Sequence, residues 1–493
     1  MLRAAGVPPA GGANLDGDVS AIEYDSRACG PGSVFVAIRG FHVDGHAFID
    51  DAVQRGAIAV VAEHAPARAP GAALVVVPDT RVALSALAAA FYARPSDSLT
   101  VAGVTGTDGK TTTCTMLWSA WRAAGINAGS LTTVDWRRGD EVTANTSRQT
   151  TLEARDLQEH LAAMRDAHCT HVALETSSHA LALHRVDDVR YRCAVYTRIT
   201  SEHLDVHGTR EAYLAAKARL ADIVARHRDG VAVLDATDDF AFPVLSGIPV
   251  ATRLTYSIDP RVAADVQAHQ VAAAPDGLHF RAQTPWGSEE VSLRLAGRFN
   301  VANACAALTA ACVTGASLRD AARGLAAVDR VPGRMELVDA GQPFAVVVDY
   351  AHTADALETV LRELRPTTRG RLWAVFGSAG ERDRDKRPEM GAVAARFADR
   401  SVITDEDPRG EDRLRILEEI AGGATAAGGA RGETVVIIPD RSEAIAYAME
   451  RAAPGDTVLL AGKGHESSII TASGPVPWNE RAVAEAALAA LSR

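Results

Sequence analysis

Paired cysteines, surplus positive charge and long apolar runs are all missing from this sequence, and each absence excludes a class of protein. The six cysteines form no CxxC pair and no zinc-ribbon spacing, which is typical of thiols that pack as small core residues in a reducing cytosol. No stretch approaches the roughly 20 apolar residues that a membrane-spanning helix needs, and residues 1–13 hold no apolar core of signal-peptide length. We therefore expect a cytoplasmic protein without a membrane partner.

The balance of charge is acidic. The 493 residues include 51 Lys and Arg against 62 Asp and Glu, for a formal net charge of −11, so a nucleic-acid partner is not expected. Hydrophobic residues (47%) and charged residues (23%) have the proportions of an ordinary globular protein. At about 150 residues per domain, the length predicts roughly three domains.

One glycine-rich stretch, residues 103–113, has the arrangement that binds nucleotide phosphates. It follows an apolar run and leads into apolar residues spaced like one face of a helix. Glycines let backbone N–H groups approach phosphate oxygens, and the helix N-terminus favours negative charge. Lys110 can reach the outer phosphates, and the Thr111 hydroxyl can bind Mg²⁺. Val104 stands where a strict Walker A sequence has its first glycine, so an ordinary glycine-rich turn is the alternative interpretation.

Breaks in the sequence pattern divide the chain into three units, residues 1–97, 98–332 and 333–493. Arg94-Pro-Ser-Asp-Ser98 ends a helical pattern before the glycine-rich stretch, and Val331-Pro-Gly-Arg334 precedes a more regular region. Short apolar strands alternate with helical patterns, which predicts an α/β protein, with a parallel sheet and right-handed crossovers in the third unit. The first βα turn of that unit lacks GxGxxG, so dinucleotide binding is not indicated.

The expected strands share short apolar runs, and the expected helices share a 3.6-residue period. One strand ends in Glu175-Thr-Ser-Ser-His-Ala180, and the carboxyl ends of parallel strands are where open α/β sheets bind ligands. The predicted strands are 34–38, 58–61, 74–77, 99–102, 171–174, 193–196, 345–348, 372–376, 402–404, 435–438 and 458–460, with mixed strands in 231–294 and helices at 81–92 and 210–226.

Short motifs along nearly the whole chain together resemble the Mur ligase family. Each motif is weak alone, and their occurrence in the family's order is specific. They are Asp25-Ser-Arg27, Asp44-Gly-His46, Thr105-Gly-Thr-Asp-Gly-Lys-Thr111, Glu175-Thr-Ser-Ser-His-Ala-Leu181, Glu202-His-Leu-Asp-Val-His-Gly208, Lys217, Phe299-Asn300 with Asn303, Val331-Pro-Gly-Arg-Met-Glu336, Asp349-Tyr-Ala-His-Thr353, Gly380-Glu-Arg-Asp-Arg384, Asp407-Pro-Arg409 and Gly462-Lys-Gly-His-Glu466.

The resemblance implies a fold and a reaction. The fold is a small N-terminal α/β domain for the UDP-sugar peptide (1–97), a central P-loop-type ATPase domain with a parallel sheet (98–332) and a C-terminal Rossmann-like domain for the amino acid (333–493). The reaction is ATP-dependent, ADP-forming ligation in peptidoglycan precursor synthesis and cell wall biogenesis. ATP phosphorylates a substrate carboxylate, and an amino acid's amine attacks the acyl phosphate. The implied partners are UDP-N-acetylmuramoyl-L-alanyl-D-glutamate and a diamino acid, bound by a monomer.

The resemblance also assigns roles residue by residue. The catalytic residues are Lys110, Glu175, His203 and Lys217, and the Mg²⁺ ligands are Thr111, Glu175, His203 and carbamylated Lys217. The ATP-binding residues are Gly106, Thr107, Asp108, Gly109, Lys110, Thr111, Thr112, Asn300, Asn303, Arg334, Asp349 and His352. The nucleotide-sugar substrate is assigned to Ser26, His46, Thr150, Thr151, Ser177 and Arg185. The amino acid is assigned to Arg382, Glu406, Asp407, Arg409, Gly462 and Glu466.

Two of these assignments also have a physical argument. Carbamylation needs a neutral amine, which burial of Lys217 beside Tyr213 and Leu220 would favour by lowering its pKa; a lysine stem lying over apolar surface is the alternative. Meso-diaminopimelate carries a distal carboxylate that lysine lacks, and the Arg409 fork suits a carboxylate. We therefore expect meso-diaminopimelate as the added amino acid, with Glu466 accepting from its far amine.

Several positions depart from the family's usual residues, and alternatives stay open. Asp108 and Arg198 stand where asparagine is usual, Glu202 stands for aspartate, Leu183 stands for glutamine, and Glu406-Asp407 replaces Asp-Asn. The alternatives are the same ligase chemistry with L-lysine or another amino acid, a folate acceptor, or a non-catalytic nucleotide-binding paralogue. Asp25-Ser-Arg27 argues against folate, and the intact Lys110 and Lys217 argue against a non-catalytic protein.

Overall fold

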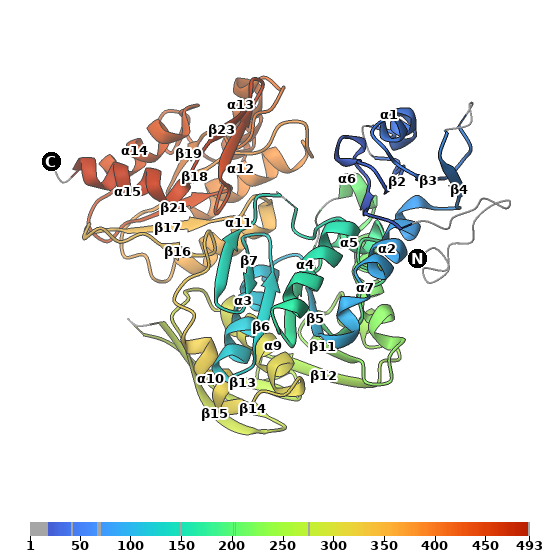
Figure 1. Cartoon of the computed structure of the whole chain (residues 1–493). Helices are drawn as coiled ribbons and strands as arrows, with labels where there is room; N and C mark the ends of the chain where they lie inside the picture. Colours follow the sequence, from blue (N-terminus) through green and yellow to red (C-terminus); the bar gives the residue numbers. More distant parts are fainter. Residues whose placement is uncertain are drawn as a thin grey trace.

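The computed structural model describes residues 18–491 apart from 41–42, 67–70, 148, 201, 203 and 275–276. Three sheets of four, eleven and six strands, and one two-stranded hairpin, form within these residues. Figure 1 shows the sheets in three successive regions of the chain, with the N-terminal region (blue) and the C-terminal region (red) both lying above the central one. No helix in this described part of the chain is both long and apolar enough to cross a bilayer.

The N-terminal sheet is parallel throughout. It consists of β1 (Ala21–Glu23), β2 (Ser33–Val36), β3 (Ala59–Ala62) and β4 (Ala73–Val76) in that order. Helices α1 (Ile49–Gln54) and α2 (Thr80–Phe91) accompany it. Separate apolar clusters cover its two faces, as a parallel sheet requires.

The central sheet has a parallel middle and antiparallel edges. Its order is β15-β14-β13-β12-β11-β10-β5-β9-β6-β7-β8. The strands are β5 (Thr100–Thr105), β6 (Ala128–Leu131), β7 (Asp135–Arg138), β8 (Glu141–Ala144), β9 (His171–Glu175), β10 (Tyr191–Tyr196), β11 (Val231–Asp235), β12 (Thr252–Ser257), β13 (Val266–Ala274), β14 (Gly277–Thr284) and β15 (Gly287–Leu293). Because side chains alternate along a strand, Val101 and Ala102 of β5 belong to opposite cores.

Helices cover both faces of the central sheet. One core holds α3 (Lys110–Ala123), α9 (Phe299–Val313) and α10 (Leu318–Ala326). The other holds α4 (Ala154–Asp166), α5 (Ser178–Ala182), α7 (Arg210–Ala225) and α8 (Phe242–Leu245). The short α6 (Leu204–His207) precedes α7. The phosphate-loop helix α3 thus begins at the centre of the largest sheet.

The C-terminal sheet runs in the order β16-β17-β21-β18-β19-β20, parallel except for β16. The strands are β16 (Glu336–Leu337), β17 (Ala345–Asp349), β18 (Leu372–Phe376), β19 (Arg400–Ile403), β20 (Val435–Ile437) and β21 (Thr457–Ala461). Helices α11 (Ala354–Leu364), α12 (Lys386–Phe397) and α13 (Arg413–Ala426) cover one face, and α14 (Arg441–Arg451) and α15 (Glu480–Leu491) cover the other. A hairpin of β22 (Ser468–Thr471) and β23 (Gly474–Pro477) follows β21.

The predicted fold class is confirmed, and the predicted strands are correct to within a few residues at their ends. The largest difference is in β5, which runs to Thr105 rather than ending at 102. One end of β2, of β10 and of β19 differs by two residues. Strands β6 to β8 were not anticipated, because Gly129-Ser130 and the polar residues of β7 and β8 lack a continuous apolar signal. The boundaries at 97/98 and 332/333 stay predictions.

Candidate active site

The glycine-rich loop joins β5 to α3, as its sequence indicates. Gly109 is the N-cap of α3 with a φ of 84°, and Gly106 has a φ of 156°. A Cβ at Gly109 would lie 2.2 Å from Asn303 Oδ1, and one at Gly106 would lie 1.8 Å from Thr197 Oγ1. Both glycines are therefore needed, because neighbouring segments pack against the loop with no room for a side chain.

Two lysines converge on this loop. The Lys110 ammonium donates to the carbonyls of Gly106 (3.0 Å) and Thr107 (2.7 Å). The Lys217 amine donates to the same Gly106 carbonyl at 2.7 Å and lies 4.4 Å from the centre of the Tyr213 ring. Lys217 is 1% exposed, and burial, followed by the nearby Lys110 charge, holds its pKa well below the ordinary value. The structure thus supplies the environment for a neutral amine at Lys217.

A buried carboxylate faces the start of α3. Glu175, at the carboxyl end of β9, is 1% exposed. Its Oε2 accepts from the Thr111 hydroxyl at 3.0 Å and from the Thr133 N–H at 2.9 Å. Hydroxyl and carboxylate oxygens are ligands that Mg²⁺ prefers. No cluster of three His, Cys, Asp or Glu able to hold a metal occurs among the described residues, and His203 lies outside them.

Residues from two other regions approach the loop. In α9, Asn303 donates its amide to Asn300 Oδ1 at 2.9 Å. From the C-terminal region, Arg334 Nη2 donates to Thr111 Oγ1 at 3.4 Å. Asp349 accepts from backbone N–H groups of Met335 and Ala351, so it orders the turn after β17. The predicted ATP-binding residues therefore gather from three distant segments.

A contact between the central and C-terminal regions lies beside them. His352 Nε2 is 3.3 Å from Glu202 Oε1, and the Tyr213 hydroxyl donates to Glu202 Oε2 at 3.4 Å. Burial alone would lower the pKa of His352, but its hydrogen bond to Glu202 raises it above the ordinary value. The Asp108 residue is exposed as a whole. Partial loss of water around its carboxylate first, and the Glu202 charge second, raise its pKa above the ordinary value, and the remaining water screens much of that effect.

Four of the residues assigned to the nucleotide-sugar substrate lie together next to Glu175. The Thr151 hydroxyl donates to the Glu175 carbonyl at 2.8 Å and accepts from the Ser177 N–H at 2.9 Å. Arg185 donates to the Thr151 carbonyl at 3.1 Å, and the Thr133 hydroxyl donates to Thr150 Oγ1 at 3.2 Å. A cluster of polar groups thus continues from the phosphate loop toward the N-terminal region.

The other two residues of that set, Ser26 and His46, belong to the N-terminal region. His46 uses both ring nitrogens internally: Nδ1 lies 2.7 Å from Asp44 Oδ1, and Nε2 accepts from the Glu63 N–H at 3.0 Å. Its imidazole therefore orders the loop that carries it, and offers neither nitrogen to a ligand in this structure. The sequence alone gave no sign of the partner Glu63.

The residues assigned to the amino acid form a second polar cluster at the carboxyl edge of the C-terminal sheet. Asp407 Oδ1 accepts from the Lys463 ammonium at 2.8 Å and from the Ile470 N–H at 2.9 Å. Lys463 also pairs with Glu466. Arg409 has a φ of 54°, a conformation uncommon outside glycine. Lys463 stands inside the Gly462–Glu466 motif, but no role was assigned to it from the sequence, so these contacts were not anticipated.

Two buried polar atoms in this cluster lack a hydrogen-bond partner within the described residues, namely Glu406 Oε2 and Arg409 Nε. A Cβ added at Gly462 would lie 3.6 Å from Glu406, so Gly462 borders the same space. Glu466 is already paired with Lys463 and with the Tyr350 hydroxyl. Glu406, rather than Glu466, thus has the uncommitted carboxylate oxygen. Arg382 is exposed on the loop before α12.

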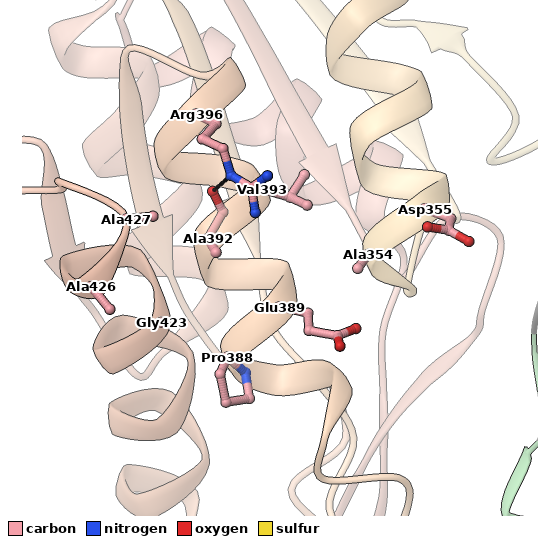
Figure 2. A pocket seen from close by; sticks show the side chains of 10 residues that line it. All are labelled: Ala354, Asp355, Pro388, Glu389, Ala392, Val393, Arg396, Gly423, Ala426 and Ala427. Atoms are coloured by element: carbon pink, nitrogen blue, oxygen red, sulfur yellow. Dashed lines mark hydrogen bonds between the residues drawn. The ribbon is translucent and has the colours of Figure 1, made fainter.

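One cavity lies apart from these clusters. It has a volume of about 540 Å³ and lies between α11, α12 and α13. Figure 2 shows that α12 contributes the largest share of the labelled lining residues, from Pro388 to Arg396, and that α13 contributes Gly423 and Ala426. None of the predicted site residues lines it, so this cavity is not part of the candidate site.

Comparisons with known proteins agree with the motifs. Three family models match in chain order: "Mur ligase family, catalytic domain" (18–92), "Mur ligase middle domain" (104–311) and "Mur ligase, glutamate ligase domain" (333–464). The chain is 50% identical to UDP-N-acetylmuramyl-tripeptide synthetase of Roseiflexus sp. (strain RS-1), over 100% of this chain and 97% of the relative.

Two further similar proteins have names that state the amino acid, 2,6-diaminopimelate. UDP-N-acetylmuramoyl-L-alanyl-D-glutamate–2,6-diaminopimelate ligase of Geobacillus thermodenitrificans (strain NG80-2) is 42% identical, over 96% of this chain and 95% of the relative. A solved structure of a ligase with this name superposes with a TM-score of 0.65 at 30% identity, covering 98% of both chains.

Proposed function

The chain belongs to the Mur ligase family, and from this premise we propose that it is an ATP-dependent ligase that adds meso-diaminopimelate to UDP-N-acetylmuramoyl-L-alanyl-D-glutamate. The observation that carries the proposal is the convergence of Lys110, Thr111, Glu175 and Lys217 on one phosphate loop. In this reaction a carboxylate oxygen of the dipeptide attacks the γ-phosphorus of ATP, and ADP leaves. The amine of the amino acid then attacks the acyl carbon, and phosphate leaves.

The loop and its neighbours bind the triphosphate. Backbone N–H groups at the start of α3 and the Lys110 ammonium face the phosphate oxygens, and Arg334 adds a cation from the C-terminal region at Thr111. These fixed charges favour the approach of a carboxylate to a polyanion. Asn300, Asn303, Asp349 and His352 form the remainder of the nucleotide site.

The donor set beside the loop fits Mg²⁺. The Thr111 hydroxyl and the buried Glu175 carboxylate present hard oxygen ligands, and His203 and a carbamylated Lys217 complete the proposed set. Bound there, Mg²⁺ neutralises charge on the phosphate oxygens. Carbamylation of Lys217 adds CO₂ to its neutral amine and releases a proton, which leaves an anionic carbamate in place of an uncharged group. The low pKa of Lys217 supports this modification.

Contacts between regions exclude water from the acyl phosphate. Arg334 reaches Thr111, and His352 reaches Glu202, from the C-terminal side. A labile intermediate needs this protection. We place Thr150, Thr151, Ser177 and Arg185 against the sugar peptide, and we place the reaction in the cytoplasm.

The uncommitted groups of the C-terminal cluster support a diamino acid with a distal carboxylate. The Arg409 guanidinium pairs with that carboxylate, and Glu406 accepts from the far amine. A guanidinium left without an anion would be penalised when lysine is bound. Asp407 and Glu466 border this pocket while bound to Lys463.

Phosphate release with ATP, Mg²⁺ and the UDP-sugar dipeptide tests the proposal against a panel of meso-diaminopimelate, L-lysine, L-ornithine and glycine. We expect turnover with meso-diaminopimelate at a kcat/KM well above that of the others. A preference for L-lysine would reassign the amino acid and keep the ligase. Release with none of them, under conditions in which ADP still binds, would contradict the proposed function.

A further inference from the structure

Tyr350 lies where three segments of the C-terminal region meet. Strands β17 and β21 are parallel neighbours, so the loops that follow them lie side by side. Tyr350, in the first loop, has its ring centre 5.0 Å from that of His465 in the second. The guanidinium of Arg334, from the segment before β16, lies 4.6 Å from the Tyr350 ring centre.

Two glycines allow this close approach. Gly464 has a φ of 49°, and a Cβ there would lie 2.9 Å from Tyr350 Cβ. Gly333 has a φ of 66°, and its Cβ would lie 2.3 Å from the His465 nitrogen. Any side chain at either position would push the loops apart, so the backbone itself packs around Tyr350.

The hydroxyl of Tyr350 contacts Glu466, a residue assigned to the amino acid. It donates to Glu466 Oε1 at 3.1 Å. The other carboxylate oxygen of Glu466 pairs with the fully buried Lys463, which also holds Asp407. Burial raises the pKa of Tyr350 well above its ordinary value, so the hydroxyl keeps its proton and remains a donor.

The ring of Tyr350 contacts Arg334, a residue assigned to the nucleotide site. A guanidinium over an aromatic face is held by cation–π attraction, and Arg334 in that position reaches Thr111 Oγ1 at 3.4 Å. One side chain thus contacts a carboxylate of the amino-acid cluster and an arginine of the phosphate site.

We infer that Tyr350 is a positioning residue with two separable tasks: its hydroxyl fixes Glu466 in the amino-acid pocket, and its ring holds Arg334 against the phosphate loop. The inference rests on the proposed function for the identity of the two substrates. It assigns to Tyr350 a coupling between the amino-acid cluster and the phosphate site.

Two substitutions separate the tasks. Tyr350→Phe removes only the hydroxyl, and we expect the KM for the amino acid to rise on the order of ten-fold, with the ATP KM and the ADP Kd unchanged. Tyr350→Met replaces the ring with a long apolar side chain that has neither a hydroxyl nor an aromatic face, and we expect it to weaken ADP binding several-fold as well. Tyr447 also carries an arginine over its ring, Arg451 at 3.8 Å, and lies outside both clusters. Tyr447→Phe and Tyr447→Met are therefore matched controls expected to behave as wild type.

A double-mutant cycle tests whether the hydroxyl acts through Glu466. In a Glu466→Ala background, Tyr350→Phe should no longer change the amino-acid KM. An unchanged KM in the single Tyr350→Phe variant, or wild-type ADP affinity in Tyr350→Met, would overturn the inference. ADP binding is measured by calorimetry, without turnover. A wild type that binds ADP but releases no phosphate would count against the proposed function. The effect of Tyr350→Met on ADP affinity could still be measured in that case, so the inference about the ring would be tested separately.

Discussion

The His352 imidazole and the Glu202 carboxylate lie 3.3 Å apart across the junction between the central and C-terminal regions. The Glu202 hydrogen bond raises the pKa of His352 in spite of burial. A group whose pKa is raised by folding contributes stability that is fully present below its unfolded pKa of about 6.5 and is lost as the pH rises through the folded pKa.

This relationship predicts a pH-dependent contact. The difference in thermal midpoint between the wild type and Glu202→Gln should be largest near pH 5.5 to 6 and should shrink as the pH is raised above the folded pKa of His352. Thermal unfolding of both proteins across pH 5.5 to 8.5 measures it. The same difference at every pH would show that His352 does not carry charge in the folded protein.

Lys110→Ala should abolish ligation without unfolding the chain. The substitution removes a charge directed at the loop carbonyls and leaves the buried core intact. Phosphate release and thermal unfolding check the two halves of the prediction. Arg415→Ala, at an exposed position of α13, is the control for removing a cation in general. Turnover like that of wild type would end the phosphate-loop interpretation.

Asp108→Asn should strengthen ATP binding or leave it unchanged, because it removes a like charge from an anion site. The Asp108 side chain is exposed at the loop, and the Glu202 charge contributes to raising its pKa. Calorimetric titration with ADP and with a non-hydrolysable ATP analogue gives the affinity. Loss of binding would assign Asp108 a direct role, such as metal coordination.

Lys217→Ala should be nearly inactive, and a small carboxylate such as acetate or formate should restore part of the activity. The added anion would take the place of the carbamate beside Gly106 and Tyr213. Initial rates with and without formate provide the measurement, and chloride at equal ionic strength is the control. Full activity of the variant without any addition would refute carbamylation.

Arg409→Ala should collapse the preference for meso-diaminopimelate over L-lysine, because only the first substrate loses a partner for its distal carboxylate. The ratio of the two kcat/KM values in wild type and variant decides this. Arg415→Ala again serves as the control, since its side chain pairs with Glu419 at 3.1 Å. A ratio that does not move would mean that Arg409 faces no substrate carboxylate.

The sequence by itself determined the local structural features of this protein. The glycines at 106 and 109, followed by Lys110 and Thr111, specify a loop-to-helix turn within a few residues, and apolar periodicity specifies the α/β alternation. Glu175 and the hydroxyl residues that follow it could be placed at the end of a strand, because the apolar run of that strand stops there. These features depend on neighbours in the chain, so no long-range information is needed.

Only the tertiary structure decided which polar side chains form hydrogen bonds or ion pairs with distant parts of the chain. Lys463 meets Asp407 across 56 residues, Tyr350 meets Glu466 across 116, and Lys217 meets Gly106 across 111. The resemblance to the family assigned Asp407, Glu466 and His46 to the substrates without any partner inside the chain, and packing gives each of them such a partner. The reason is physical: a buried polar group must find a partner, and which partner it finds depends on how parallel strands bring their carboxyl ends together.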